Sequence, residues 1–229
     1  MTEAYQSNLK KLFSTSILNI PQYQRAYSWD SKHVRDLLND IDSLYDSLSP
    51  EVVSDTDNFH YLGTIVLREQ GKISLGDSDF EKYDIIDGQQ RLLTISLLIS
   101  TINQKLEQLE EDLPDDIFGP GERPPSRVKD RNREDYISYA GEKRIDAKKI
   151  NQDTFNDLVV FNKSANNADT TLSSQKRLVD SKKSIEDWLD TKLKNTDSQR
   201  KKFERLNQLL NIINSDLEVT VTEVTETKE

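Results

Sequence analysis

The sequence predicts an α+β fold in which a small mixed β-sheet packs on a long central helix, followed by a mainly helical second half. Two apolar segments rich in β-branched residues, 61–68 (YLGTIVLR) and 83–86 (YDII), are typical of buried strands. Directly after them, residues 89–111 are apolar on nearly every side at first, which indicates a helix inside the core. From residue 136 onward, apolar residues recur mainly at helical spacing.

Local signals predict the elements of the first half in order. Residues 18–30 (LNIPQYQRAYSWD) contain a helix-breaking proline and are predicted to form an extended strand or loop. Ser31 is the expected N-cap of an amphipathic helix that ends before Pro50. Residues 72–75 pair weakly with the strand before them, and three acidic residues form the expected hairpin tip: Asp77, Asp79 and Glu81.

The second half begins with a segment rich in proline and glycine. This segment, 112–135, is predicted to be a linker or mobile loop between a core of residues 1–111 and a helical region of residues 136–229. The expected elements of the helical region are helices over 153–161, 173–194 and 198–213 and a strand over 217–224.

Composition excludes several classes of protein. The 229 residues include 31 Lys and Arg against 41 Asp and Glu, a net charge of −10 that disfavours a protein coating nucleic acid by bulk charge. There is no cysteine, hence no disulfide or thiolate metal site, and no apolar run of membrane-spanning length or signal peptide. A cytoplasmic location is therefore expected. With only His33 and His60, a histidine-dependent nuclease has almost nothing to build from.

The most informative motif is the strand–turn–helix at 83–93 (YDIIDGQQRLL). The strand delivers the carboxylate of Asp87, Gly88 permits close approach of a ligand, and the helix that follows begins with Gln89, Gln90 and Arg91. Unpaired N–H groups at a helix start, together with a guanidinium, suit an anion such as phosphate. The alternative is that Asp87 and Gly88 form only a turn and a helix cap.

A second group of polar residues lies among aromatic ones. Gln24 and Arg25 are flanked by Tyr23, Tyr27 and Trp29, and such aromatics can stack a base while the arginine contacts phosphate. The alternative is a structural strand whose aromatic side chains fill the core.

Together the two groups match a known pattern. PQYQRAYSWD, YLGTIVL and YDIIDGQQRLLTISLL, in this order, resemble the N-terminal domain of GmrS–GmrD-type modification-dependent restriction proteins. The element order is similar to the ParB/sulfiredoxin fold, in which a helix start with an arginine binds nucleotide phosphate. The resemblance is strong over residues 20–102, looser over 144–159, and fades in the linker and the later helices.

This resemblance implies a sensor domain that binds and hydrolyses a nucleoside triphosphate and is coupled to a nuclease domain or subunit carrying a His-Asn-His motif. It also implies that modified phage DNA is a partner. The residues that it implies at the nucleotide pocket are Gln24, Arg25, Asp87, Gly88, Gln89, Gln90 and Arg91, with Tyr27, Trp29 and Thr64 nearby. Asp87, Gln90 and Arg91 would be catalytic, with Asp87 holding Mg²⁺ or orienting water. The rival is a non-catalytic DNA-binding module whose pocket holds a DNA phosphate. A third alternative is a degenerate scaffold that neither hydrolyses a nucleotide nor binds DNA by itself.

Two further expectations concern nucleic acid. The second half of the expected linker is basic, which is compatible with DNA contact or simply with a solvated loop: Arg123, Arg127, Lys129, Arg131 and Arg133. In the family, the strand resembling 217–224 is followed by a Phe-Glu-x-x-Asn segment and the nuclease. The chain is therefore expected to be truncated before a nuclease domain and not to cut DNA by itself.

Overall fold

The core of the fold is a six-stranded mixed sheet, which confirms the predicted α+β class. The computed structural model describes residues 2–47, 59–147, 149–167 and 170–225. In spatial order the strands are β1 (Thr2–Asn8), β8 (Leu217–Val224), β3 (His60–Leu75), β4 (Ser78–Asp87), β2 (Ser16–Asn19) and β7 (Ile145–Asp146). β8 runs antiparallel to β1 and parallel to β3, β3 is antiparallel to β4, and β2 is parallel to both β4 and β7.

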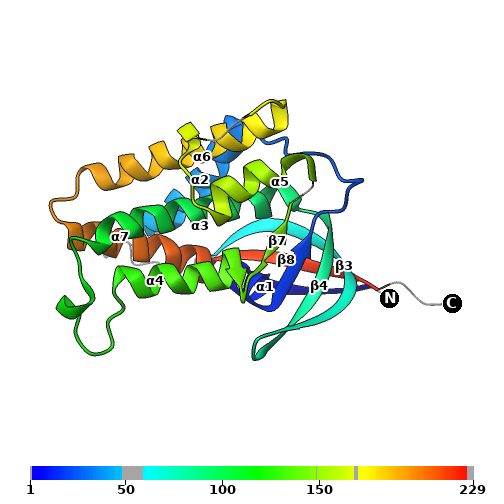
Figure 1. Cartoon of the computed structure of the whole chain (residues 1–229), viewed down its shortest axis with the longest axis horizontal. Helices are drawn as coiled ribbons and strands as arrows, with labels where there is room; N and C mark the ends of the chain where they lie inside the picture. The colour runs from blue at the N-terminus through cyan, green and yellow to red at the C-terminus, as the bar shows by residue number, and fades with distance from the viewer. Residues whose placement is uncertain (1, 48–58, 148, 168–169, 226–229) are drawn as a thin grey trace.

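The helices gather on one side of the sheet, with α3 in their midst (Figure 1). Their bounds are α1 (Leu9–Thr15), α2 (Ser31–Ser47), α3 (Gln89–Glu110), α4 (Pro125–Asn132), α5 (Lys149–Phe155), α6 (Ser173–Lys194) and α7 (Gln199–Asn211). Short 3-10 turns lie at Asp115–Ile117 and Ala165–Asn167, π-helical turns at Arg133–Ile137, Asn156–Val160 and Ile212–Asp216, and a small hairpin joins β5 (Ser138–Tyr139) to β6 (Glu142–Lys143).

The predicted strands form a hairpin longer than expected. β3 and β4 pair from Val66 opposite Asp87 to Leu75 opposite Ser78. The expected pairing of residues 72–75 with the strand before them is wrong, because 72–75 continue β3 itself and pair with residues 78–81 of β4. Of the expected tip residues, only Asp77 lies in the turn. Asp79 and Glu81 are inside β4, where alternate side chains face solvent and tolerate charge.

Helix α3 is the central core helix that its apolar sequence predicts. Its buried hydroxyl groups do not break this pattern, because three of them find a carbonyl one turn earlier and Ser100 donates to the Leu158 carbonyl. Thr94 donates to the Gln90 carbonyl at 2.8 Å, Ser96 to Leu92 at 3.0 Å, and Thr101 to Leu97 at 2.7 Å.

Three predicted boundaries differ in the structure. Helix α2 begins at Ser31, but its cap is Asp30, whose carboxylate accepts from the N–H groups of residues 32 and 33 at 3.0 and 3.2 Å. Residues 20–30 form a loop after the short strand β2. The helix expected over 153–161 begins earlier, at Lys149, and ends in a π-helical turn. Pro50 lies outside the described residues.

The expected linker is wrong over its second half, because residues 125–132 form helix α4. Pro125 occupies the first turn, where a missing N–H costs nothing and the fixed φ favours a helix. Helix α4 packs along α3, and Asn132 donates a hydrogen bond to Asn103 at 3.1 Å in the interior. Two of the prolines that suggested a loop, Pro124 and Pro125, therefore start a helix.

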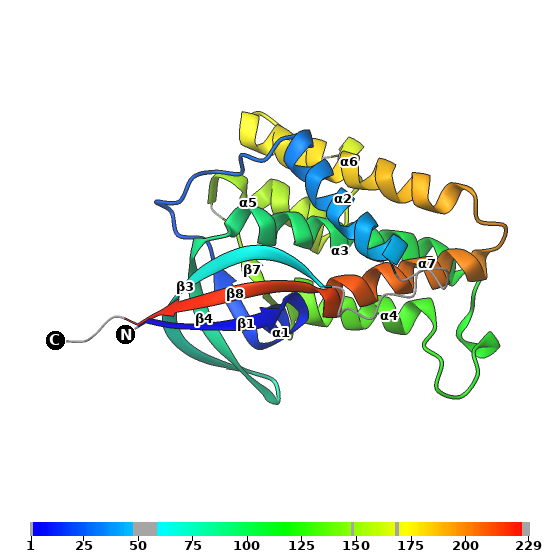
Figure 2. The same ribbon diagram turned by 180° about the vertical axis from the view of Figure 1, so that it is seen from behind.

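The N-terminal elements β1 and α1 carried no clear sequence signal. Strand β1 (TEAYQSN) is an exposed edge strand without apolar alternation, and α1 is only 7 residues long. The chain's last strand, β8, lies between β1 and β3, so the two ends of the chain lie side by side in the sheet (Figure 2). Nearly all of the described buried apolar side chains form one continuous core across both halves.

Candidate functional site

A groove of about 340 Å³ lies where β4 ends and α3 begins. It is lined by Gln24, Arg25, Trp29, Ile86, Asp87, Gly88, Gln89, Gln90 and Arg91. The two polar groups singled out in the sequence, some 60 positions apart, therefore form one surface. The structure brings together eight of the ten predicted pocket residues, all except Tyr27 and Thr64.

Gly88 makes the turn from β4 into α3, and only glycine fits there. Its φ of +92° is in the left-handed region. A Cβ at this position would also overlap the side chain of Ile65 on β3. The backbone at the start of α3 is therefore held in one conformation, with its first N–H groups at the groove.

Three glutamine side chains tie the 20–30 loop to this turn. Gln24 donates to the Ile86 carbonyl at 2.8 Å, and Gln89 donates to the Arg25 carbonyl at 3.0 Å. Gln90 accepts from the Ser28 N–H at 2.8 Å. Gln90, predicted to be catalytic, is thus engaged in holding the loop. Gln89 keeps a buried side-chain oxygen without a partner in the described residues, which can accept a hydrogen bond from a ligand or water.

Arg91 is positioned by β3. Its guanidinium donates to the Thr64 carbonyl at 3.0 Å, which uses one of its five N–H groups. Gly63, with φ of +95°, allows this approach, since a Cβ there would lie 2.9 Å from the guanidinium. Thr64 therefore anchors Arg91 by its backbone rather than lining the groove. Hydrogen bonds with Thr220 and Thr64, and secondarily the Arg91 charge, lower the pKa of the neighbouring Tyr61 phenol.

The groove has one carboxylate, Asp87, which is exposed at its rim. The described residues contain no cluster of three or more His, Asp or Glu side chains that could hold a metal by themselves. With a single carboxylate, this groove can hold Mg²⁺ only if phosphate oxygens and water supply most of the ligands. Arg25 is also exposed, so the groove presents two cations and one anion to a ligand.

Of the two aromatic residues predicted near the pocket, Trp29 lines the groove and Tyr27 does not. Trp29 lines the groove and stacks on His33, with ring centroids 5.8 Å apart. Tyr27 lies in the core, where its hydroxyl contacts Thr94 at 2.8 Å and Ser181 at 3.0 Å. Burial raises the pKa of this phenol. Tyr27 therefore fills the core, which is the alternative interpretation that the sequence left open for this segment.

The five basic residues expected to contact DNA do not share one surface. Arg123 and Arg131 line a cavity of about 300 Å³ with Lys10 and four asparagines, whereas Lys129 and Arg133 line a different one. Lys129 is paired with Glu110 at 2.5 Å. The separation arises because α4 directs neighbouring residues of the segment to different faces.

The two histidines each pair with one carboxylate and lie on separate elements. His33 contacts Asp30 at 2.7 Å, and His60 contacts Asp40 at 3.1 Å. A residue that the sequence did not single out is Asp84, nearly buried in β4 and hydrogen-bonded by Arg68 at 2.7 Å and Asn19 at 2.6 Å. It is a satisfied buried carboxylate beside the strand end that carries Asp87.

Fold and groove together define a class of protein: a mixed α+β domain in which a strand, a glycine turn and a long helix present an arginine and helix N–H groups to one groove. A family model described as GmrSD restriction endonuclease, N-terminal domain, matches residues 9–228. The chain therefore belongs to this family of N-terminal domains, as the motifs at 21–30 and 83–98 indicated.

Membership of this family supports a role in antiphage restriction. No curated protein matches the chain. Within the described residues, no helix has both the length and the apolar character needed to span a membrane.

Proposed function

We propose that this domain binds and hydrolyses a nucleoside triphosphate in the groove and serves as the sensor for modified phage DNA in its restriction system. The observation that carries the proposal is that Arg25, Arg91 and the open start of α3 meet in one groove of about 340 Å³. This volume falls within the range usual for small-molecule sites, ~300–1,000 Å³.

The expected contacts follow from the groove lining. The N–H groups of the first turn of α3 and the guanidinium of Arg91 surround one phosphate, and Arg25 approaches from the opposite wall. Trp29 offers an aromatic face to the base or ribose. Because Gly88 and the glutamine hydrogen bonds already hold the turn and the loop, little reorganisation is needed on binding.

Hydrolysis requires water to attack the γ-phosphorus while the bond to the bridging oxygen of the β-phosphate breaks, which yields a nucleoside diphosphate and phosphate. Asp87, at the rim, is the group that orients this water or ligates a Mg²⁺ ion, which would neutralise phosphate charge. Gln90 contributes by holding the loop at residue 28, so we assign it a positioning role.

The test is phosphate release from each nucleoside triphosphate with Mg²⁺, measured with and without modified DNA. We expect release, and we expect DNA to change its rate. Absence of release with every nucleotide, while DNA still binds, would instead favour a non-catalytic module whose groove holds a DNA phosphate.

Calorimetry on groove variants locates the site. Arg91→Ala should weaken nucleotide binding by at least tenfold, since a charge-assisted hydrogen bond contributes ~1.5–3 kcal/mol. Arg91→Lys should restore only part of this loss, because an ammonium lacks the planar fork. Asp87→Ala should retain binding and lose turnover. Arg177→Ala, an exposed change on α6, is the matched control. Parent-like affinity of Arg91→Ala would place the nucleotide elsewhere.

A further inference from the structure

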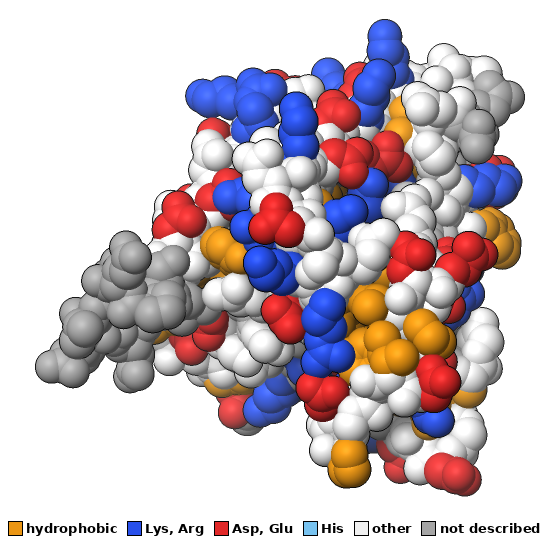
Figure 3. Space-filling model, turned by 90° about the vertical axis from the view of Figure 1, so that its left-hand side faces the viewer, with side chains coloured by type: hydrophobic (Ala, Val, Ile, Leu, Met, Phe, Trp, Pro, Cys, Tyr) orange, Lys and Arg blue, Asp and Glu red, His pale blue; other side chains and the backbone are white. Residues whose placement is uncertain are grey.

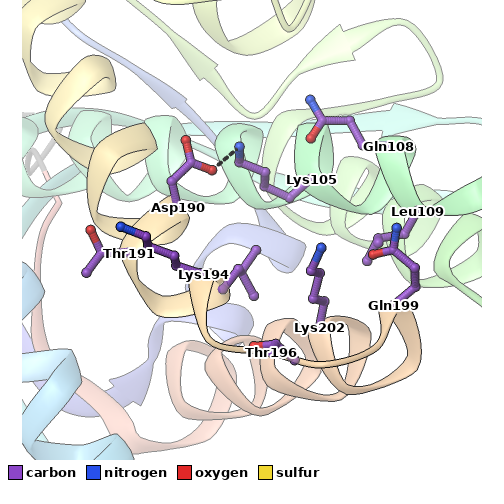
Figure 4. A pocket seen from close by; sticks show the side chains of 10 residues that line it. Lys105, Gln108, Leu109, Asp190, Thr191, Lys194, Thr196, Gln199 and Lys202 are labelled. Atoms are coloured by element: carbon purple, nitrogen blue, oxygen red, sulfur yellow. Dashed lines mark hydrogen bonds and ion pairs between the residues drawn. The ribbon is translucent and has the colours of Figure 1, made fainter.

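A second cavity, of about 460 Å³, lies far along α3 from the groove. The C-terminal half of α3, the end of α6 and the start of α7 form its walls, and Lys105, Gln108, Lys194, Thr196, Gln199 and Lys202 are among the lining residues (Figure 4). Figure 3 faces the end of the molecule where α6 leads into α7, and it shows many Lys and Arg side chains on that face with Asp and Glu side chains between them.

The lining is positively charged in a chain whose net charge is −10. Lys105, Lys194 and Lys202 are opposed by one lining carboxylate, Asp190, which Lys105 already contacts at 2.5 Å. Within the described part of the chain, neither Lys194 nor Lys202 forms an ion pair. Two ammonium groups are therefore available to an anion. Lys202 is half-buried, where the attraction is screened less than on an open surface, and Lys194 is exposed.

The same walls hold two polar atoms with unmet hydrogen bonds. Gln199 donates its amide N–H to Asp112 at 2.5 Å, which leaves its side-chain oxygen buried and without a partner among the described residues. The Thr196 hydroxyl oxygen is also buried and has no hydrogen-bond partner among the described residues. Since buried polar atoms are normally hydrogen-bonded, a ligand with O–H or N–H donors would satisfy the acceptor of Gln199.

We propose that this cavity binds a second, free nucleotide. A nucleotide carries both anionic phosphate oxygens for the lysines and donor groups for the walls, and its size suits the cavity. Helix α3 links this site to the groove: Arg91 is in its first turn, and Lys105 follows 14 positions later, ~21 Å along the axis.

The experiment is calorimetric titration of the whole chain with ADP, inorganic pyrophosphate and a short DNA duplex. The double variant Lys194→Gln/Lys202→Gln is compared with Lys176→Gln/Lys183→Gln, which removes two exposed lysines of α6 outside the cavity. All titrations are repeated in the Arg91→Ala background, so that binding in the groove and in the cavity are separated.

We expect ADP to remain bound in the Arg91→Ala background, and the cavity variant to lose about tenfold or more of that affinity, while the control matches the parent. Pyrophosphate, which lacks the donor groups of ribose and base, should bind more weakly than ADP. Equal affinity of the cavity and control variants for ADP would overturn the proposal, as would a loss confined to the DNA duplex. Because ADP binding to the cavity is measured with Arg91 removed, the result can be interpreted even if the function proposed for the groove is wrong.

Discussion

Gly88 shows how one residue sets the geometry of the groove. Its left-handed backbone and its contact with Ile65 both exclude a side chain, and these two effects are separable. A positive φ by itself costs a non-glycine residue ~1–2 kcal/mol. Steric overlap with a packed side chain adds ~1–3 kcal/mol.

We therefore predict that Gly88→Ala lowers the free energy of unfolding by ~2–5 kcal/mol, measured by urea denaturation. The matched control is Gly121→Ala. Gly121 has a similar φ of +88° but open space around it, so the control should show only the backbone cost. Equal losses in the two variants would mean that Ile65 does not restrict the turn.

Lys182 is the most unusual residue of the core. It lies on α6 with none of its surface exposed, and its ammonium donates to the Leu158 carbonyl at 2.7 Å. Desolvation lowers its pKa to about 8, and the more distant Glu186 offsets this only in part. Ser100 also donates to the Leu158 carbonyl, so that carbonyl has a second partner.

Because the pKa of Lys182 is lowered in the folded protein, we predict that the free energy of unfolding rises with pH. The pKa of Lys182 is about 8 when folded and near its ordinary value of 10.5 when unfolded, so between these values the unfolded chain binds more protons. The free energy of unfolding should increase by up to ~3 kcal/mol over this window. Above about pH 10 the buried tyrosines act oppositely, because they ionise more readily when unfolded.

The variant Lys182→Met isolates the effect, since the tyrosine contribution is common to both proteins. Methionine removes the buried charge, and Ser100 still satisfies Leu158, so the variant should be as stable as the parent at pH 7 or more stable. As the pH rises from 8 to 10, the parent should gain stability relative to the variant. Urea midpoints across this range measure it, and parallel curves for the two proteins would contradict the assignment.

At the scale of elements, helix α4 changes what the basic segment can do. Arg131 of α4 and Arg123 just before it line a cavity with Lys10 and Asp135, while Arg127 is exposed on α4. If this side contacts DNA, as the sequence suggested, its arginines neutralise phosphates and release counterions. Lys129 and Arg133, on the other side, should not take part.

We predict that the triple variant Arg123→Ala/Arg127→Ala/Arg131→Ala weakens DNA binding and lowers the slope of log affinity against log salt by up to ~3, at ~0.9 per phosphate contact. Lys129→Ala/Arg133→Ala is the control from the other side of α4. The measurement is fluorescence anisotropy at several salt concentrations. An unchanged slope in the triple variant would remove α4 from the DNA interface.

At the scale of the whole molecule, the last strand is structurally central. β8 lies between β1 and β3, and Leu217, Val219 and Val221 are buried in the common core. A chain that ends at Asp216 would leave two strand edges unpaired and an apolar face uncovered.

We predict that residues 1–216 do not unfold cooperatively, whereas residues 1–225, which retain all of β8, melt like the full chain. Near-ultraviolet circular dichroism during heating distinguishes the two. A cooperative transition in the shorter chain would show that the sheet is stable without its central strand.

Elements with a strong local signal were predictable from the sequence. The period of apolar residues defined α6 and β8, and the continuous apolar run defined α3, because burial of a helix face or strand face leaves a direct record in residue order. Strand β1 and helix α4 were not predictable. One is a polar edge strand without alternation, and the other begins with a proline that local reasoning interprets as a break.

By itself, the sequence determined the α+β class, the family and the turn from Asp87 to Arg91, because each depends on local segments and on their order along the chain. Only the tertiary structure decided that Tyr27 is a core residue, that Gln90 holds a loop and that Lys194 and Lys202 face one cavity. The physical reason is that a side chain's role depends on partners far away in sequence. Tyr27 meets Ser181, and the groove joins segments that only the packing of β4 and α3 brings together.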